Sequence, residues 1–343
     1  MEELQIFDIA TAENPTDAKA FYYFGNLLYF LEHKANAITA WEESAQLDPK
    51  FGLTARNLGF AYDREGNSAQ AITWYEHSIR MDATNPRTFT EIDQVYQKIG
   101  KPAKERLALL QKNLKTVMRH DDAVMRLLGL YHETGDYDKS IKILDTRHFH
   151  VWEGSGQIHE IFVDAHLLKG ISLTNRRRYD EAIKHFALAD SYPDNLEVGR
   201  PDNGGQFAKI YYYMGKAYAA KGDKDKAREC FVKAVVEPRG RSRGISEREM
   251  FRAMALQELG EKAKANDLIA ACKTYIETQL SSRSLIDEFS KFGEDGTPSQ
   301  RLSQIFYLNG LASYAQGDKT KANEEFAKAI RANRNMIWPK LFQ

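Results

Sequence analysis

The stretch LYFLEHKANAITAWEESAQLDP, residues 28–49, is followed by AYDREGNSAQAITWYEHSIRMDA, residues 61–83, and the two share a pattern of small and large residues. Four positions recur 34 residues later: Gly25 as Gly59, Ala37 as Ala71, Trp41 as Tyr75 and Asp48 as Asp82. Where two helices cross, glycine or alanine lets the backbones approach, and a large residue one turn away fills the remaining space. The stretch therefore predicts repeated pairs of antiparallel helices.

The same pattern extends along the chain. A glycine and an alanine twelve residues apart recur as Gly215 with Ala227 and as Gly310 with Ala322. Glycine ends a helix in the left-handed conformation without strain, and it occupies six of eight turn positions: Glu32, Gly66, Gly100, Gly135, Arg177, Gly222, Gly260 and Gly317. With its period of 34, the pattern resembles the tetratricopeptide repeat family. The resemblance implies an all-α fold, a right-handed superhelix (α-solenoid) of about eight helix pairs.

We expect a single solenoid over residues 1–343, with units at about 15–49, 50–84, 85–119, 120–147, 157–193, 206–238, 246–280 and 300–333. The third and seventh units are degenerate, and a last segment, 334–343, is expected to cap the exposed end of the stack. Repeats are regular over 15–147, where turn positions lie 34 or 35 residues apart. Over 148–333 the spacing rises to between 38 and 57 residues, which predicts inserted loops along one edge.

The composition argues against several classes of function. The 48 basic and 48 acidic side chains balance, so nothing draws the chain to nucleic acid or to an anionic membrane. No apolar run is as long as a membrane span, and the N-terminal residues are too acidic for a signal peptide, which slightly favours a cytoplasmic protein. Cys230 and Cys272 lack metal-ligand spacing and are expected to be buried thiols. Without a phosphate-binding loop or a nucleophile motif, we expect no enzyme and no cofactor.

Four of the nine histidines lie within nineteen residues: His148, His150, His159 and His166. A zinc site needs three or four ligands converging at about 2 Å, and the chain has no HExxH or other metal motif. His166 falls on a large packing position of its repeat. We therefore expect His159 and His166 to pack in the core and His148 and His150 to lie in a loop without a metal, with a zinc site as the alternative.

The first helices of the first three repeats predict a peptide-binding groove. In tetratricopeptide domains that hold extended peptides, asparagines on adjacent first helices clamp the peptide main chain, and basic residues grip its terminal carboxylate. Asn26, Asn57 and Arg87 match these positions, whereas Tyr22 and Glu91 replace two basic residues. We therefore predict an extended peptide or a protein loop as the ligand, rather than a free C-terminal tail. By helical spacing four tyrosines point partly into the groove, where we expect inter-helix packing, with a binding surface as the alternative: Tyr22, Tyr23, Tyr212 and Tyr213.

Three inserted loops, 147–156, 192–205 and 237–246, form a second candidate binding surface, which we call the loop edge. Loops on a rigid scaffold are where binding groups usually lie. The candidate contacts are His150, Trp152, Glu153, Asn195, Arg200 and Asp202. Trp152 is suited to stack on a sugar ring while Glu153 or His150 makes polar contacts. The alternative function is therefore a carbohydrate-binding or glycoside-processing site on the loop edge.

Four stretches outside the repeat consensus carry a second resemblance: FGNLLY (24–29), ERLALLQ (105–111), RHFHVWEG (147–154) and YPDNL (192–196). They resemble the C-terminal tetratricopeptide half of large bacterial proteins whose N-terminal part is a mutarotase-like β-sandwich of unassigned function, often in carbohydrate-utilisation contexts. The chain departs from that family at Val151, in place of proline, and at Ser155, in place of a second glycine. We therefore predict a non-enzymatic scaffold that binds a protein or extended peptide, with a β-sandwich domain of the same polypeptide as one candidate partner.

Overall fold

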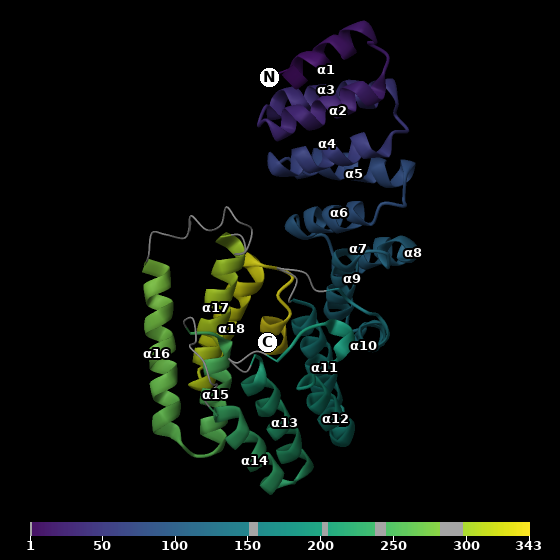
Figure 1. The fold of residues 1–343 in the computed structure, drawn as a ribbon. Coiled ribbons are helices and arrows are strands. Elements are labelled where there is room, and N and C mark those ends of the chain that lie inside the picture. The colour runs from purple at the N-terminus through teal and green to yellow at the C-terminus, as the bar shows by residue number, and fades with distance from the viewer. Residues whose placement is uncertain (1, 151–156, 201–204, 237–244, 282–297) are drawn as a thin grey trace. The chain divides into compact units, whose positions relative to one another are not determined.

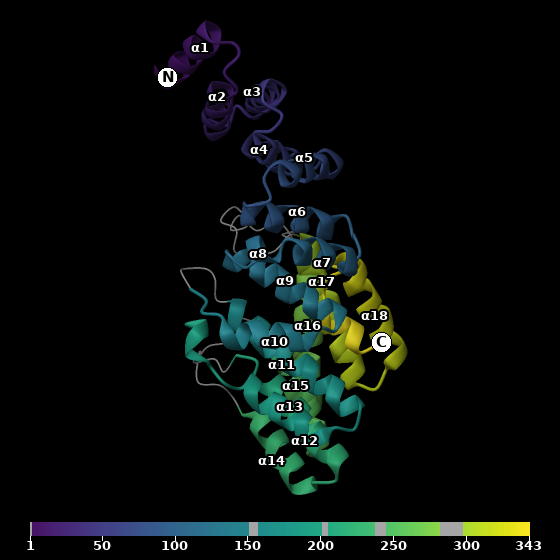
Figure 2. The same cartoon turned by 90° about the vertical axis from the view of Figure 1, so that its right-hand side faces the viewer.

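A computed structural model describes residues 2–150, 157–200, 205–236, 245–281 and 298–343. All regular structure within these ranges is helical (Figures 1 and 2), which confirms the predicted all-α fold. Trp152, Glu153 and Asp202 lie outside the described residues, as does most of the 237–246 loop. Their predicted roles in binding therefore stay predictions.

The chain divides into two compact units, Met1–Leu130 and Tyr131–Gln343, with the boundary inside helix α9 (Asp121–Thr134). The first unit contains α1 (Glu2–Glu13), α2 (Ala18–Phe30), α3 (Lys34–Leu47), α4 (Gly52–Arg64), α5 (Ser68–Met81), α6 (Pro86–Lys98), α7 (Ala103–Lys112) and the short α8 (Leu114–Val117). The repeat pattern did not predict α1. Its Phe7 stacks on Phe24 of α2, with ring centroids 6.0 Å apart.

The second unit continues the series of helix pairs. Its helices are α10 (Tyr137–Thr146), α11 (Gln157–Asn175), α12 (Tyr179–Ala189), α13 (Phe207–Lys221), α14 (Lys224–Val235), α15 (Glu247–Glu258), α16 (Lys262–Ser281), α17 (Pro298–Ala315) and α18 (Lys319–Ala332), with the 3₁₀ turns η1 (Asp194–Leu196) and η3 (Trp338–Leu341). Successive pairs from α11 to α18 pack side by side (Figure 1). Apart from α1 and the short α8, the helices of each unit follow one another as pairs, one pair in each of the eight predicted repeats.

Glycines pack directly against aromatic rings inside the pairs. A Cβ atom on Gly25 would lie 2.5 Å from the indole of Trp41, and one on Gly59 would lie 2.8 Å from the ring of Tyr75. The same contact joins three pairs of the second unit: Gly170 with Phe186, Gly215 with Phe231, and Gly310 with Phe326. The predicted combination of small and large residues is therefore confirmed as the packing unit of the repeat.

All eight predicted turn positions have positive φ angles. The six glycines have φ between 76° and 97°, while Glu32 has φ 64° and Arg177 has φ 60°. For a residue with a Cβ this conformation costs about 1–2 kcal/mol. The geometry of the repeat therefore requires the left-handed turn even where the sequence does not supply glycine.

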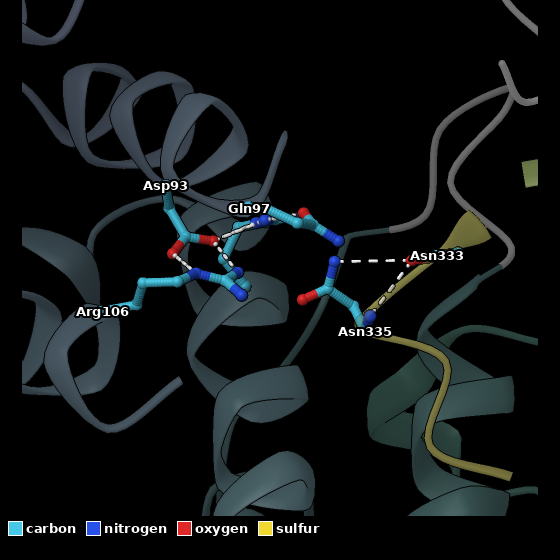
Figure 3. Close-up of polar contacts among 6 residues, drawn as sticks. Asp93, Gln97, Arg106, Asn333 and Asn335 are labelled. Atoms are coloured by element: carbon cyan, nitrogen blue, oxygen red, sulfur yellow. Dashed lines mark hydrogen bonds and ion pairs between the residues drawn. The ribbon is translucent and has the colours of Figure 1, made fainter. Parts of the chain in front are cut away.

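The degenerate third repeat replaces the packing glycine with a buried charge. Asp93 lies 34 residues after Gly59 and is 1% exposed. Its carboxylate accepts hydrogen bonds from Arg106 Nε at 2.8 Å and Nη2 at 2.9 Å (Figure 3), and from Arg126 Nε at 2.6 Å. Buried ion pairs thus join α6, α7 and α9 where the regular repeats use a glycine and an aromatic ring.

Two cysteines and two histidines lie in the core, as the sequence predicts. Cys230 and Cys272 are buried free thiols, and burial raises their pKa values to about 11 and about 12. His159 and His166 are 8% and 1% exposed, which confirms their assignment to packing. Among the helices of the described ranges, none combines the length and the apolar character needed to cross a bilayer.

Candidate functional site

A cavity of about 530 Å³ lies in the second unit. Its polar lining comes mainly from the first helices of successive pairs: Glu160 and Asp164 from α11, Lys209 from α13, Glu247 from α15 and Tyr307 from α17, together with Trp338 of η3. Glu160 and Asp164 share one helix face because they lie four residues apart. Carboxylates, an ammonium group and aromatic rings therefore meet in one cavity.

Lys209 is the buried cation of this cavity, with a side chain that is 2% exposed. Its Nζ lies 3.0 and 3.2 Å from the two carboxylate oxygens of Glu247 and 3.2 Å from the centroid of the Trp338 ring. Tyr307 Oη donates a hydrogen bond to Glu247 Oε2 at 3.0 Å. Burial raises the pKa of Tyr307 well above its ordinary value, so the phenol keeps the proton that it donates. The Lys209 charge is thus balanced by Glu247 and covered by an aromatic face.

Asp164 is less completely satisfied. Trp338 Nε1 donates a hydrogen bond to Asp164 Oδ2 at 3.2 Å, whereas Oδ1 is buried without a hydrogen-bond partner in the described part of the chain. Burial raises the pKa of Asp164 to about 6, against the opposing effect of the nearby Lys209 charge. Burial and the Glu247 charge also raise the pKa of Glu160. Each of these two carboxylates can accept a hydrogen bond from a ligand or form an ion pair with a cationic group of the ligand.

Sequence reasoning did not select Lys209, Glu247 or Trp338 as site residues. The one available signal was a lysine inside the apolar and aromatic stretch FAKIYYYMG of α13. Trp338 belongs to the segment predicted as a cap. In that segment, Phe342 packs on Phe326 with ring centroids 5.2 Å apart, while Trp338 lines the cavity.

The first unit brings together two residues of the predicted peptide groove. Asn57 Nδ2 donates to Asn26 Oδ1 at 2.7 Å, and Trp41 Nε1 donates to the same oxygen at 3.2 Å. Arg87 is exposed on α6. Glu91, which stands at a basic position of the clamp, is held instead by both Nε and Nη2 of Arg56, with Nε at 2.8 Å from its carboxylate. At the position where the carboxylate clamp has a basic residue, this chain therefore has an acidic residue, Glu91, that is paired with Arg56.

The tyrosines proposed for the groove pack against other rings. Tyr22 is half-buried, with its ring 5.0 Å from Phe51 and 5.1 Å from Tyr23. Tyr212 is 8% exposed and packs against Phe251 at 5.7 Å, so it lies in the core rather than on an accessible surface. Tyr212 therefore follows the expected inter-helix packing, because it contacts Phe251 of the neighbouring helix α15.

Two segments of the loop edge are joined by hydrogen bonds. Asn195 Nδ2 donates to the carbonyl oxygens of Leu144 and Arg147, both at 2.7 Å, and Phe149 N donates to Asn195 O at 2.8 Å. Asn195, predicted as a ligand contact, thus caps carbonyl groups at the end of α10. Arg200 likewise makes internal contacts, because its guanidinium donates to the carboxylate of Asp190 at 2.9 Å and to its carbonyl at 2.6 Å.

The exposed histidines meet a residue that sequence reasoning did not select. His148 Nε2 lies 2.7 Å from Glu197 Oε1, and His150 Nδ1 lies 3.6 Å from the same oxygen. The contact joins residues 49 positions apart. Neither spacing nor periodicity predicts it, because Glu197 follows an irregular 3₁₀ turn in an inserted loop.

Comparison with known proteins finds the same kind of repeat in two segments of the chain. Residues 57–85 and 208–236 each match the tetratricopeptide repeat. The TPR repeat-containing protein YpiA of Bacillus subtilis (strain 168) is 28% identical over 138 residues, which cover 40% of this chain and 32% of YpiA. The chain therefore matches about a third of the length of that curated relative.

Similar solved structures include further tetratricopeptide proteins. One, from Parabacteroides merdae, is 16% identical, with 85% of this chain and 96% of that chain covered and a TM-score of 0.42. Another is YrrB, described as a TPR protein with an unusual peptide-binding site. It is 20% identical, the match covers 67% of this chain and 90% of YrrB, and the TM-score is 0.32. Tetratricopeptide repeat proteins are protein-interaction scaffolds and are generally non-catalytic. From the matched residues and the helix pairs, this chain contains tetratricopeptide repeats and has an all-α fold of the solenoid type.

Proposed function

We propose that this chain is a non-enzymatic scaffold that binds a segment of a partner protein in the cavity of the second unit. The observation that carries the proposal is the buried Oδ1 atom of Asp164, which has no hydrogen-bond partner among the described residues. A buried polar atom left unsatisfied costs about 1–3 kcal/mol. A donor supplied by a ligand would recover this free energy, and the cavity of about 530 Å³ has room for a side chain.

The charges around the cavity indicate which side chain fits best. Lys209 is held by Glu247, and no ion pair in the described part of the chain joins it to Asp164 or Glu160. The two α11 carboxylates therefore offer negative charge to the cavity. A lysine or arginine of the partner would form charge-assisted hydrogen bonds there, which are stronger than neutral ones.

Short random peptides displayed on phage and selected on the full chain test this proposal. We expect the selected peptides to be enriched in lysine or arginine and to bind the Glu160→Gln, Asp164→Asn double variant about tenfold or more weakly, as loss of a hydrogen bond to a charged group implies. Glu261→Gln is the matched control, since Glu261 is exposed and pairs only with the neighbouring Lys264 in the described structure. Equal affinity for the double variant and the control would exclude the cavity as the peptide site.

The groove of the first unit is a second candidate contact for an extended peptide. Among the described residues, the Asn26–Asn57 hydrogen bond leaves Asn26 Nδ2 and Asn57 Oδ1 available for a peptide main chain. Asn57→Ala should weaken binding of an identified peptide if this groove takes part. A β-sandwich domain as the partner and a carbohydrate at the loop edge stay predictions. Trp152, Glu153 and Asp202, on which the carbohydrate site depends, lie outside the described residues.

A further inference from the structure

Two histidines and one glutamate from two separate loops converge on the surface of the second unit. Their potential ligand atoms all lie within 4.8 Å of one another. His148 Nε2 is 2.7 Å and His150 Nδ1 is 3.6 Å from Glu197 Oε1. In a tetrahedral zinc site with bonds of about 2.0–2.1 Å, ligand atoms are about 3.4 Å apart. We propose that His148, His150 and Glu197 bind a divalent transition-metal ion of the zinc type.

The residue between the two histidines fixes their common direction. Phe149 is 2% exposed, whereas the side chains of His148 and His150 are 53% and 78% exposed. Burying Phe149 turns its two neighbours outward together, and their ring centroids are 4.8 Å apart. The core thus anchors a pair of imidazoles on one side of the chain.

Glu197 is anchored in a similar way. The preceding Leu196 is fully buried, and Asn195 makes hydrogen bonds to Leu144, Arg147 and Phe149 that join the two loops. Protein contacts therefore bring the three side chains together before any ion binds. Such preorganisation lowers the cost of assembling a metal site.

The donor set selects the class of ion. Two imidazole nitrogens and one carboxylate oxygen suit zinc and neighbouring transition metals, whereas Mg²⁺ and Ca²⁺ prefer oxygen ligands. Three protein ligands leave one tetrahedral position open for water or for a donor group of another molecule. The exposure of the histidines gives the ion a path of entry.

Isothermal titration of the chelator-treated full chain with zinc chloride tests the site. We expect one zinc ion per chain, and no heat with magnesium chloride. His148→Ala, His150→Ala and Glu197→Gln should each weaken zinc binding by about tenfold or more, since even residues that only orient metal ligands change affinity by about 10–100-fold. All three side chains are exposed, so the variants should retain the circular dichroism spectrum of the wild type.

His33→Ala is the matched control, because His33 is an exposed histidine of the first unit and should leave zinc affinity unchanged. Absence of zinc binding by the wild type would overturn the proposal. So would a His148→Ala, His150→Ala double variant that keeps full affinity. That result would place the ion elsewhere, for example at His166 and His185, whose Nδ1 atoms are 3.0 Å apart.

Discussion

The carboxylate of Asp93 accepts a hydrogen bond from Arg106 Nε at 2.8 Å, at the position that Gly25 and Gly59 occupy in the two preceding repeats. Both side chains are at most 2% exposed. The glycine of a regular repeat makes room for an aromatic ring. In the third repeat the same position holds a buried ion pair. Equivalent positions of the repeat are therefore packed in two different ways in this chain.

We expect Asp93→Ala to destabilise the first unit by about 3–5 kcal/mol, because removing one partner of a buried ion pair leaves the other charge poorly compensated. Asp63→Ala is the control. Asp63 pairs with the exposed Lys98 at 3.2 Å, and loss of a surface pair should cost about 1 kcal/mol or less. Urea unfolding of the two variants measures the difference. Similar losses of unfolding free energy in both variants would show that the contribution of Asp93 to stability does not depend on its burial.

Gly59→Ala should destabilise the chain by about 1–3 kcal/mol, because the new Cβ would lie 2.8 Å from the Tyr75 ring and overpack the pair. Gly129→Ala should have the opposite effect on stability. Gly129 lies in α9, and a Cβ added there would have no neighbouring atom within 4 Å, so alanine should stabilise that helix by about 0.5–1 kcal/mol. Thermal unfolding distinguishes the two variants. A stabilising Gly59→Ala would contradict the close-packing role of this glycine.

Arg177→Gly should stabilise the chain by about 0.5–1 kcal/mol. Arg177 has φ 60°, and the gain from relieving the left-handed conformation exceeds the added entropy of glycine in the unfolded state. At the equivalent turn, Gly222 has φ 97°, and Gly222→Ala should destabilise by about 1–2 kcal/mol. Chemical denaturation of both variants tests the pair. Changes of the same sign would mean that the turn conformation does not control stability.

Asp164 should make stability depend on pH. Its pKa is raised from 3.8 to about 6 in the folded chain, so between these values the folded state holds a proton that the unfolded state has released. Stability therefore falls as pH rises from about 4 to about 6, and the penalty stays constant above that range.

Asp164→Asn removes this penalty and should stabilise the chain by about 3 kcal/mol at pH 7, with the gain disappearing towards pH 4. Urea unfolding of the variant and the wild type across this range checks the sign. A gain that persists at pH 4 would exclude titration of Asp164 as its cause.

The residues that were predictable are those whose partners lie at fixed offsets along the chain. Gly25, Trp41 and the turn at Glu32 belong to one helix pair, so spacing in the sequence is equivalent to position in the structure. The burial of His166 followed from the same register. Eight helix pairs could therefore be placed from the residue pattern alone, although α1 and the short α8, which lie outside the pairs, were missed.

The candidate sites depend on contacts that no period encodes. Lys209 meets Trp338 from the last turn of the chain, and His148 meets Glu197 across 49 positions in an inserted loop. The sequence by itself determined the repeated helix pair, because small and large residues at constant offsets encode local packing. Only the tertiary structure decided which charged side chains come together, because their neighbours come from different repeats and from loops, where burial and hydrogen bonding rather than spacing select the partner.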